Sequence, residues 1–302
     1  MIGTMVNGSR SVWLIALLVV AFGCAGPRVA QQTPAAAPAP AQVQASDSQS
    51  DLLNAVLWMQ RSVEYKASAL TAFALARIRL DQALADPNWT AAPKEQTGAY
   101  QSLPPAIVLD IDESILDNSG YQAWMALKGT SFDPKTWNAY VNTVTSQAIP
   151  GALEFARYAD GKGVKVFYVS NRTAEEEPAT RKNLEKLGFP LDDKIDTLLS
   201  AREQPDWGSA KGTRRAVVAR NYRVLLNVGD NFGDFVDEYR GTEAERLRVM
   251  EEHKDRWGRE WIMLANPAYG SFESAPFKHD FKLSNGDRRR AKRAVLDAWP
   301  GP

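Results

Sequence analysis

The sequence has little of what several kinds of metal and nucleic-acid site require. Its 302 residues include one cysteine, Cys24, and two histidines, His253 and His279. A single cysteine excludes an internal disulfide, and two scattered histidines argue against a histidine-rich zinc site. Positive charge is not in excess either, because 36 basic residues balance 36 acidic ones, so binding to a nucleic acid polymer is not expected. A bound metal ion is therefore expected to have mainly oxygen ligands.

The N-terminal residues have the composition of a targeting segment. A positively charged start and an apolar run too short for a membrane span predict a secretory signal peptide over residues 1–23. The run ends in Ala21-Phe-Gly-Cys24, which resembles the lipobox of bacterial lipoproteins, although Ala21 and Phe22 replace the usual leucine and small residue. Lipid modification of Cys24 is predicted; the alternative is an ordinary signal peptide with a buried cysteine near the cut.

Residues 24–50 are rich in proline, alanine and glutamine and have almost no large apolar side chain. Such a segment cannot bury enough surface to fold, so a disordered, extended tether is predicted. With the lipid anchor, the tether predicts a bacterial envelope protein, attached to the outer membrane and facing the periplasm or the cell surface. Residues 51–302 are expected to form the folded domain, and the sequence leaves open whether it is a monomer or a homodimer.

From residue 51 onward, apolar segments of strand length alternate with helical patterns, which predicts an α/β domain with a parallel sheet flanked by helices. A long amphipathic helix is expected first, over residues 51–85, with Asp51 as N-cap and Asp86-Pro87 as its stop. Residues 121–149 hold many aromatic side chains on short helices, which suggests a lid next to the first strand. Buried strands are expected at 106–109, 164–169, 196–200, 224–229 and 261–265, with helices at 151–161, 175–187 and from 211 onward. A basic run at 288–293 is expected on the solvated face of a terminal helix.

The clearest chemical signal is the end of the first predicted strand, where the apolar run stops at Asp110-Ile111-Asp112. If the chain stays extended through Ile111, both carboxylates lie on one face. Two like charges this close repel each other unless a cation or a proton lies between them, and Mg²⁺ prefers oxygen ligands of this kind. The alternative is that Asp110 only ends a strand and Asp112 caps the next helix.

Polar residues follow the second predicted strand as well. Ser170-Asn171-Arg172 stands directly after it, and a hydroxyl and a guanidinium at the carboxyl end of a strand can donate to phosphate oxygens. The alternative is that Ser170 caps the following helix.

The fourth predicted strand again ends in acid, at Gly229-Asp230, with Asp234 four residues further on. A helical turn after the strand would direct both carboxylates towards the same cation, and Gly229 would allow a tight backbone turn. Lys211 opens the helix before this strand. Together these downstream features favour a catalytic site over strand ends and caps alone.

In this order the motifs resemble those of the haloacid dehalogenase (HAD) superfamily, and within it the class C acid phosphatases, the lipoprotein e(P4) 5'-nucleotidase family. The likeness covers most of the chain from about residue 51. Ser114 stands where the family usually has threonine, and Gly233 where aspartate is common, which leaves Asp230 and Asp234 in place. The resemblance implies a HAD-like, Rossmann-like fold with a small, mostly helical cap over about residues 116–150.

The resemblance also implies a role for each motif. Asp110 would be the nucleophile and Asp112 the general acid and base, while Ser170 and Lys211 would clamp the phosphate. The further expected contacts are Asn171 and Arg172 with the phosphate, Trp137 and Tyr269 on either side of a nucleobase, and Asp110, Asp112, Asp230 and Asp234 with Mg²⁺.

The expected function is that of a magnesium-dependent acid phosphatase. It would hydrolyse phosphomonoesters, nucleoside 5'-monophosphates in particular, through an aspartyl-phosphate intermediate. Two alternatives stay open on the sequence alone. One is a non-catalytic envelope lipoprotein that binds haem or another partner through its aromatic residues, and the other is a phosphotransferase that uses the same site.

Overall fold

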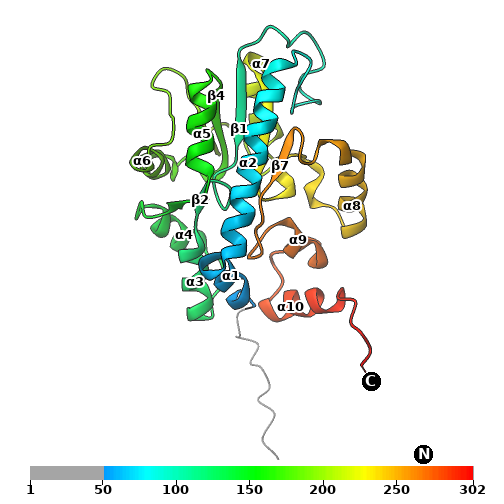
Figure 1. Cartoon of the computed structure of the whole chain (residues 1–302). Coiled ribbons are helices and arrows are strands. Elements are labelled where there is room, and N and C mark those ends of the chain that lie inside the picture. Colours follow the sequence, from blue (N-terminus) through cyan, green and yellow to red (C-terminus); the bar gives the residue numbers. More distant parts are fainter. Residues whose placement is uncertain (1–50, 302) are drawn as a thin grey trace, which may run out of the picture. The chain divides into compact units, whose positions relative to one another are not determined.

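The computed structural model describes residues 51–301 (Figure 1). The predicted signal peptide, the tether and Cys24 lie outside the described residues. Every helix within residues 51–301 is too short or too polar to span a lipid bilayer.

A parallel sheet of five strands, in the order β5-β4-β1-β6-β7, forms the centre of the domain. Along the chain, β4 and β5 add to one side of β1, and β6 and β7 then add to its other side. The strand order therefore reverses between β1 and β6, and in open α/β sheets the crevice at such a point is the usual ligand site. The predicted fold class is confirmed. The strands are β1 (Pro105–Leu109), β4 (Lys165–Thr173), β5 (Leu198–Ala201), β6 (Arg223–Gly229) and β7 (Trp261–Met263).

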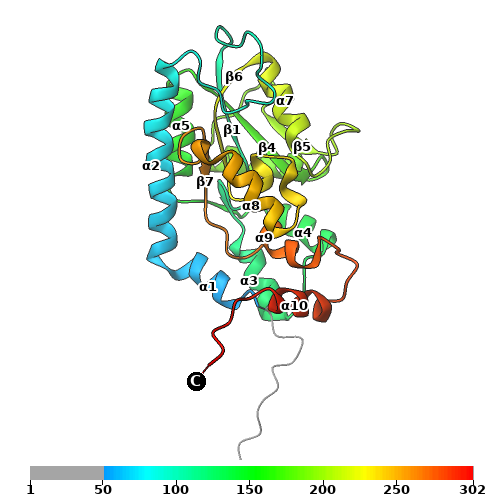
Figure 2. The same ribbon diagram turned by 90° about the vertical axis from the view of Figure 1, so that its right-hand side faces the viewer.

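Successive side chains of β1 point to opposite faces of the sheet, so the core has two layers. Ile107 and Leu109 pack into one cluster of buried side chains, and Ala106 and Val108 pack into another on the opposite face of the sheet. Helices α2, α5 and α6 contribute to the first cluster, and α7 and α8 to the second; Figure 2 shows α2 and α7 on opposite sides of the strands. The flanking helices are α2 (Val63–Ala85), α5 (Ala152–Gly161), α6 (Glu177–Leu187), α7 (Gly212–Asn221) and α8 (Glu243–Glu252).

The prediction of one long helix over residues 51–85 is wrong. The structure has two helices, α1 (Leu53–Arg61) and α2 (Val63–Ala85). They are separated by Ser62, whose backbone is extended and whose hydroxyl accepts a hydrogen bond from the backbone N–H of Tyr65 at 3.0 Å. Serine is a preferred N-cap, so it starts a new helix here. Asp51 is not a cap; its carboxylate pairs with Arg289 at 2.9 Å.

An insertion follows β1 directly. Its first and last segments, β2 (Leu116–Asp117) and β3 (Gln147–Ala148), pair antiparallel and close it at the base. Between them lie α3 (Ser119–Lys128) and α4 (Pro134–Val141). We call residues 116–148 the aromatic insertion, because α3, α4 and their connection hold the ring cluster Tyr121, Trp124, Phe132, Trp137 and Tyr140.

The second strand of the sheet, β4, is longer than predicted. It continues to Thr173, so Ser170, Asn171 and Arg172 belong to its carboxyl end. Ser170 does not cap the next helix, since the N-cap of α6 is Glu176. The remaining short helices are η1 (Phe232–Asp234), η2 (Glu238–Arg240), η3 (Lys254–Arg256), α9 (Ser271–Ser274), η4 (Ala275–Phe277) and the terminal basic helix α10 (Asn285–Ala294).

Candidate active site

Three carboxylates meet where the strand order reverses. Asp110 follows β1, Asp230 follows β6, and Asp234 ends the single turn η1. The backbone N–H of Asp110 donates to the carbonyl of Val228 at 2.9 Å, which holds the two strand ends together. One oxygen of each of the three carboxylates lies within 4.8 Å of the other two.

Asp234 is positioned by its own turn. The backbone N–H of Asn231 donates to Asp234 Oδ2 at 2.8 Å, in a capping box with the Asn231 side chain. A Cβ atom on Gly229 would lie 2.3 Å from the same Oδ2, so only glycine permits this approach. The predicted reason for Gly229 was a tight turn; its backbone φ is not positive, and close packing is the observed reason.

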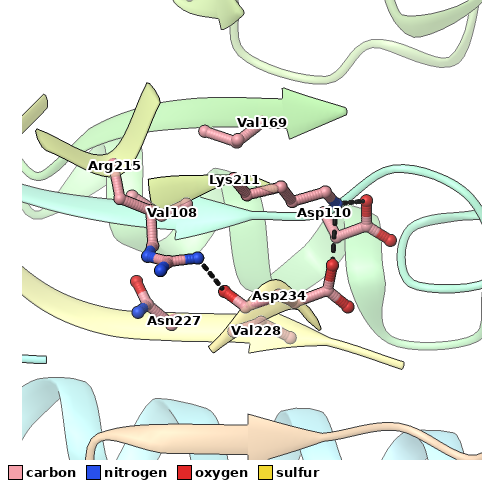
Figure 3. Close-up of a pocket in the computed structure, with 8 residues that line it drawn as sticks. All are labelled: Val108, Asp110, Val169, Lys211, Arg215, Asn227, Val228 and Asp234. Carbon is pink, nitrogen blue, oxygen red and sulfur yellow. Dashed lines mark hydrogen bonds and ion pairs between the residues drawn. The ribbon is translucent and has the colours of Figure 1, made fainter. Parts of the chain in front are cut away.

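Lys211 lies between two of the carboxylates (Figure 3). Its ammonium is 2.7 Å from Asp234 Oδ1 and forms a second, short contact with Asp110 Oδ1. The Lys211 residue is 4% exposed. Burial lowers the pKa of Lys211, but the charges of Asp110 and Asp234 outweigh burial and raise the pKa above its usual value. Lys211 is therefore a permanent cation in this pocket.

The donor set fits a divalent cation. Three carboxylates against one ammonium leave an excess of two negative charges. Burial, and after it the charges of Asp110 and Asp234, raise the pKa of Asp230 well above its usual value. The Ser114 hydroxyl lies 2.7 Å from Asp110 Oδ2 and 3.0 Å from Asp230 Oδ1, and its single hydrogen cannot satisfy both. Oxygens within 4.8 Å of one another can share a cation with bonds of about 2.0–2.6 Å.

The side chain of Asp112, which was expected to bind the metal, is not one of the three carboxylates of this cluster. Its Oδ1 accepts from Arg172 Nε at 2.9 Å, from Arg172 Nη2 at 2.8 Å and from Asn118 Nδ2 at 2.8 Å. Among residues 51–301, no hydrogen bond reaches Asp112 Oδ2. One oxygen is thus anchored and the other is available for proton transfer.

Arg172 also has partners that sequence reasoning did not predict. It is 2% exposed, and besides Asp112 its guanidinium donates to Thr180 Oγ1 at 3.1 Å and to Asn118 Oδ1 at 3.2 Å. With these partners Arg172 orients Asp112, while its expected contact with a phosphate stays a prediction. The sheet explains the contact with Asp112, because β1 and β4 are paired up to Leu109 and Tyr168, and Asp112 and Arg172 follow just beyond that pair.

Ser170 and Asn171 differ in what their side chains can offer a ligand. Ser170 Oγ accepts from the backbone N–H of Arg172 at 3.0 Å, and its hydroxyl hydrogen has no acceptor in the described part of the chain. The Asn171 amide is engaged instead, with Ser209 O at 3.0 Å and with Arg214 Nη2 at 2.7 Å. Arg214 is fully buried and also donates to the Ser170 carbonyl, so it supports the carboxyl end of β4.

The two aromatic residues expected around a base reach the site from different elements. Trp137 of α4 packs on Tyr121 at 5.1 Å between ring centroids, and the Arg172 guanidinium lies 5.5 Å from its ring. Tyr269 comes from the loop after β7, and its hydroxyl donates to Glu113 Oε2. Both aromatic residues thus lie near Asp112, Trp137 through Arg172 and Tyr269 through Glu113.

Glu113, Ser114, Asn118 and Arg214 were not singled out as site residues by sequence reasoning. Glu113 is fully buried, and burial, followed by the charge of Asp112, raises its pKa to about 8. A signal existed for three of the four, since they stand in the same stretch as Asp110 and Asp112. Nothing in the sequence distinguishes the buried carboxylate of Glu113 from an exposed one.

Fold and site together define an α/β protein of the HAD type, with an aspartate pair after β1 and two further aspartates after β6. The chain belongs to the HAD superfamily, subfamily IIIB, the acid phosphatases, whose sequence profile matches residues 17–272. The predicted family is confirmed.

Solved structures of relatives agree with this assignment. The class C acid phosphatase from Bacillus anthracis superposes with a TM-score of 0.74 and 31% identity, covering 84% of this chain and 99% of that one. A second structure of that protein, with tungstate bound, superposes with a TM-score of 0.73 at the same identity and coverage.

Plant proteins are more distant relatives. The stem 28 kDa glycoprotein of Glycine max is 24% identical over 138 residues, which are 44% of this chain and 54% of that protein. Acid phosphatase 1 of Solanum lycopersicum is 27% identical over 134 residues, 43% of this chain and 51% of that protein. The chain thus spans about half the length of the curated relatives it matches.

Proposed function

We propose that the protein is a divalent-metal-dependent acid phosphatase that hydrolyses phosphomonoesters, nucleoside 5'-monophosphates in particular. The observation that carries this proposal is the convergence of Asp110, Asp230, Asp234 and Lys211 at the carboxyl ends of β1 and β6. Tungstate is a tetrahedral oxyanion like phosphate, and its presence in the Bacillus anthracis relative supports an oxyanion site in the shared fold.

In the proposed reaction, a carboxylate oxygen of Asp110 attacks phosphorus while the bond from phosphorus to the leaving oxygen breaks. The attacking carboxylate and the phosphate dianion repel each other, and a divalent cation bound by Asp110, Asp230 and Asp234 would supply the compensating charge. Lys211 adds a fixed positive charge beside the attacking group. The free hydroxyl hydrogen of Ser170 orients a non-bridging oxygen.

Asp112 is suited to move the proton that this reaction requires. Its Oδ1 is held by Arg172 and Asn118, which leaves Oδ2 to donate a proton to the leaving oxygen. Oδ2 then accepts a proton from the water that attacks the aspartyl phosphate, so inorganic phosphate leaves and Asp110 and Asp112 return to their starting states. General acid and base help of this kind contributes about 10²- to 10⁴-fold to the rate.

Recognition of a nucleobase rests on Trp137 and Tyr269. Aromatic side chains stack bases of any sequence, so two rings beside the nucleophile turn support a leaving group that carries a base. The test is a panel of phosphomonoesters, with and without Mg²⁺ and EDTA, measured on the wild type and on Asp112→Asn. Metal-dependent release of phosphate, strongest for nucleotides and slowed about 10²- to 10⁴-fold in the variant, is expected.

Two outcomes of this panel would contradict the proposal. Absence of turnover on every ester would favour the alternative of a non-catalytic binding protein. Transfer of phosphate to an added alcohol in preference to water would favour the phosphotransferase alternative.

We also propose the envelope location, with the membrane as partner through lipid-modified Cys24, from the sequence pattern alone. Mass spectrometry of the membrane-extracted protein should find an acylated N-terminal cysteine, and Cys24→Ser should release the protein from the membrane fraction. Equal membrane association of the variant would contradict the anchor.

A further inference from the structure

Glu113 is a buried carboxylate for which the proposed reaction has no use. It is 0% exposed, and both of its oxygens are engaged. Oε1 accepts from the backbone N–H of Asn118 at 2.9 Å, and Oε2 accepts from the hydroxyl of Tyr269, 156 residues away in the sequence. The side chain therefore links the turn after β1 to the loop after β7.

The backbone of Glu113 is strained. Its φ is +58°, in the left-handed region that residues with a Cβ atom seldom adopt, and its N–H donates to Leu116 O at 2.9 Å. Such strain persists only where surrounding contacts over-determine it, and it gathers at functional sites. Here the compensating contacts are the two hydrogen bonds of the buried carboxylate.

Tyr269 is held from three directions. Its hydroxyl is bound by Glu113, and its ring packs against the cluster of Met59, Tyr65 and Ala268 at the junction of α1 and α2. In the same loop, Asn266 Nδ2 donates to Asp230 Oδ2 at 2.8 Å, while Asn266 Oδ1 accepts from the backbone N–H of Ala268 at 2.9 Å. The position of the Tyr269 ring is therefore tied to the turns after both β1 and β6.

We propose that Glu113 is a positioning residue that fixes the Tyr269 ring relative to Asp110 and Asp112, so that a base held by Tyr269 presents its phosphate to the nucleophile. The proposal rests on the proposed function, because it assigns a specificity role within that site. Glu113 does not touch the reacting atoms; it acts through Tyr269. This contact would favour substrates with a planar leaving group over small alkyl phosphates.

The test compares three single variants, one double variant and one control variant by a ratio of catalytic efficiencies. The ratio is kcat/KM for a nucleoside 5'-monophosphate divided by kcat/KM for a small alkyl phosphate. Tyr269→Phe keeps the ring and removes only the hydroxyl, Glu113→Ala removes the carboxylate and keeps the Cβ, and Glu113→Gln keeps a group that can bond to both partners.

We expect Tyr269→Phe and Glu113→Ala each to lower this ratio about tenfold, mainly through a higher KM for the nucleotide, as loss of one buried hydrogen bond that leaves its partner unsatisfied predicts. The double variant should be no worse than Glu113→Ala, because both changes break the same contact. Glu113→Gln should recover most of the ratio. The matched control is Tyr158→Phe, which removes a hydroxyl on α5 that donates to Asp81 of α2 at 2.7 Å. This variant should leave the ratio as in the wild type.

Three results would overturn the proposal: equal losses on both substrates, additive losses in the double variant, or a ratio that none of the variants changes. If Glu113→Ala does not fold, Tyr269→Phe and Glu113→Gln alone decide between these results. Non-additive shifts of the thermal midpoint in the same variants report the contact without any substrate. If the variants show this coupling of thermal midpoints but the wild type hydrolyses no ester, the result contradicts the proposed function and leaves the contact between Glu113 and Tyr269 in place.

Discussion

The pocket between β1 and β6 and the aromatic insertion both adjoin the turn at residues 110–112, and they differ in charge and in exposure. Asp110, Lys211 and Asp234 are each less than 10% exposed. In the aromatic insertion, Trp124 and Phe132 are 40% and 60% exposed, and the cluster carries no charge of its own. Charges act strongly where water is excluded, whereas rings that receive a ligand must be reachable. The pocket is therefore suited to chemistry and the insertion to recognition.

The largest expected effect comes from removing the nucleophile. Asp110→Asn should lower kcat by about 10⁴-fold or more, because no other group in the pocket is placed to attack phosphorus. The fold should be retained, since Lys211 keeps its contact with Asp234 at 2.7 Å. Phosphate release and circular dichroism on the same sample check both points. Normal turnover in this variant would remove Asp110 from its proposed role.

Lys211→Met is expected to affect stability as well as activity. It leaves Asp110 and Asp234 as unpaired buried carboxylates, which costs about 3–5 kcal/mol of unfolding free energy in the absence of metal. Added Mg²⁺ should recover part of this loss, because a cation would neutralise the same carboxylates. Denaturant unfolding with EDTA and with Mg²⁺ measures the difference. A variant as stable as the wild type in EDTA would mean that the pocket does not depend on this charge.

Metal binding itself should be visible in thermal unfolding. A divalent cation at one hundred times its dissociation constant should stabilise the wild type by about 2.7 kcal/mol. Asp230→Asn should lose most of this gain, while Asp192→Asn, at a surface pair with Lys165, should keep it. Equal stabilisation of all three proteins would place the bound ion elsewhere.

The pH dependence of the metal-free protein follows from Asp230. Its pKa is raised in the folded state, so the folded protein binds more protons than the unfolded one above the usual carboxylate pKa. Stability should therefore fall as pH rises from about 4 towards neutrality. Saturating Mg²⁺ should weaken this dependence, because it favours the ionised form. Unfolding curves over this range, with Asp230→Asn as control, provide the measurement.

The smallest expected effect lies in the aromatic insertion. Trp137→Ala should raise KM for nucleoside monophosphates by about 5- to 150-fold, as loss of one stacked base at about 1–3 kcal/mol predicts, with little change in kcat. An alkyl phosphate should be affected less. Similar losses on both substrates would indicate that Trp137 supports the cap, through Tyr121 and Arg172, without contacting a base.

Much of the fold was predictable because apolar runs of strand length have to be buried. All five strands of the sheet were found, with ends that shift by a few residues. The break at Ser62 was missed because the apolar pattern continues across it and only the cap differs. Asp110, Asp112, Asp230 and Asp234 were predicted to converge on one ion. Asp110, Asp230 and Asp234 do converge, since parallel strands bring their carboxyl ends to one edge, whereas the Asp112 side chain lies outside this group.

The partners of each charge were not predictable in the same way. Arg172 follows Ser170 and was expected on the phosphate, and its contact with Asp112, which the pairing of β1 with β4 brings about, was not predicted. Glu113 stands beside Asp112 in the sequence, yet its left-handed backbone directs its carboxylate to Tyr269. Which charges pair depends on side-chain direction across neighbouring elements, which no local pattern specifies.

The sequence by itself thus determined which segments form the strands of the sheet and which acids follow them, because hydrophobic burial and strand periodicity act over a few residues. Only the tertiary structure decided that Lys211 lies between two aspartates and that Glu113 is buried against a tyrosine from the far end of the chain. It also decided that, within residues 51–301, one oxygen of Asp112 has no hydrogen-bond partner. These pairings form when distant segments exclude water together, which makes each contact strong and each unpaired charge costly.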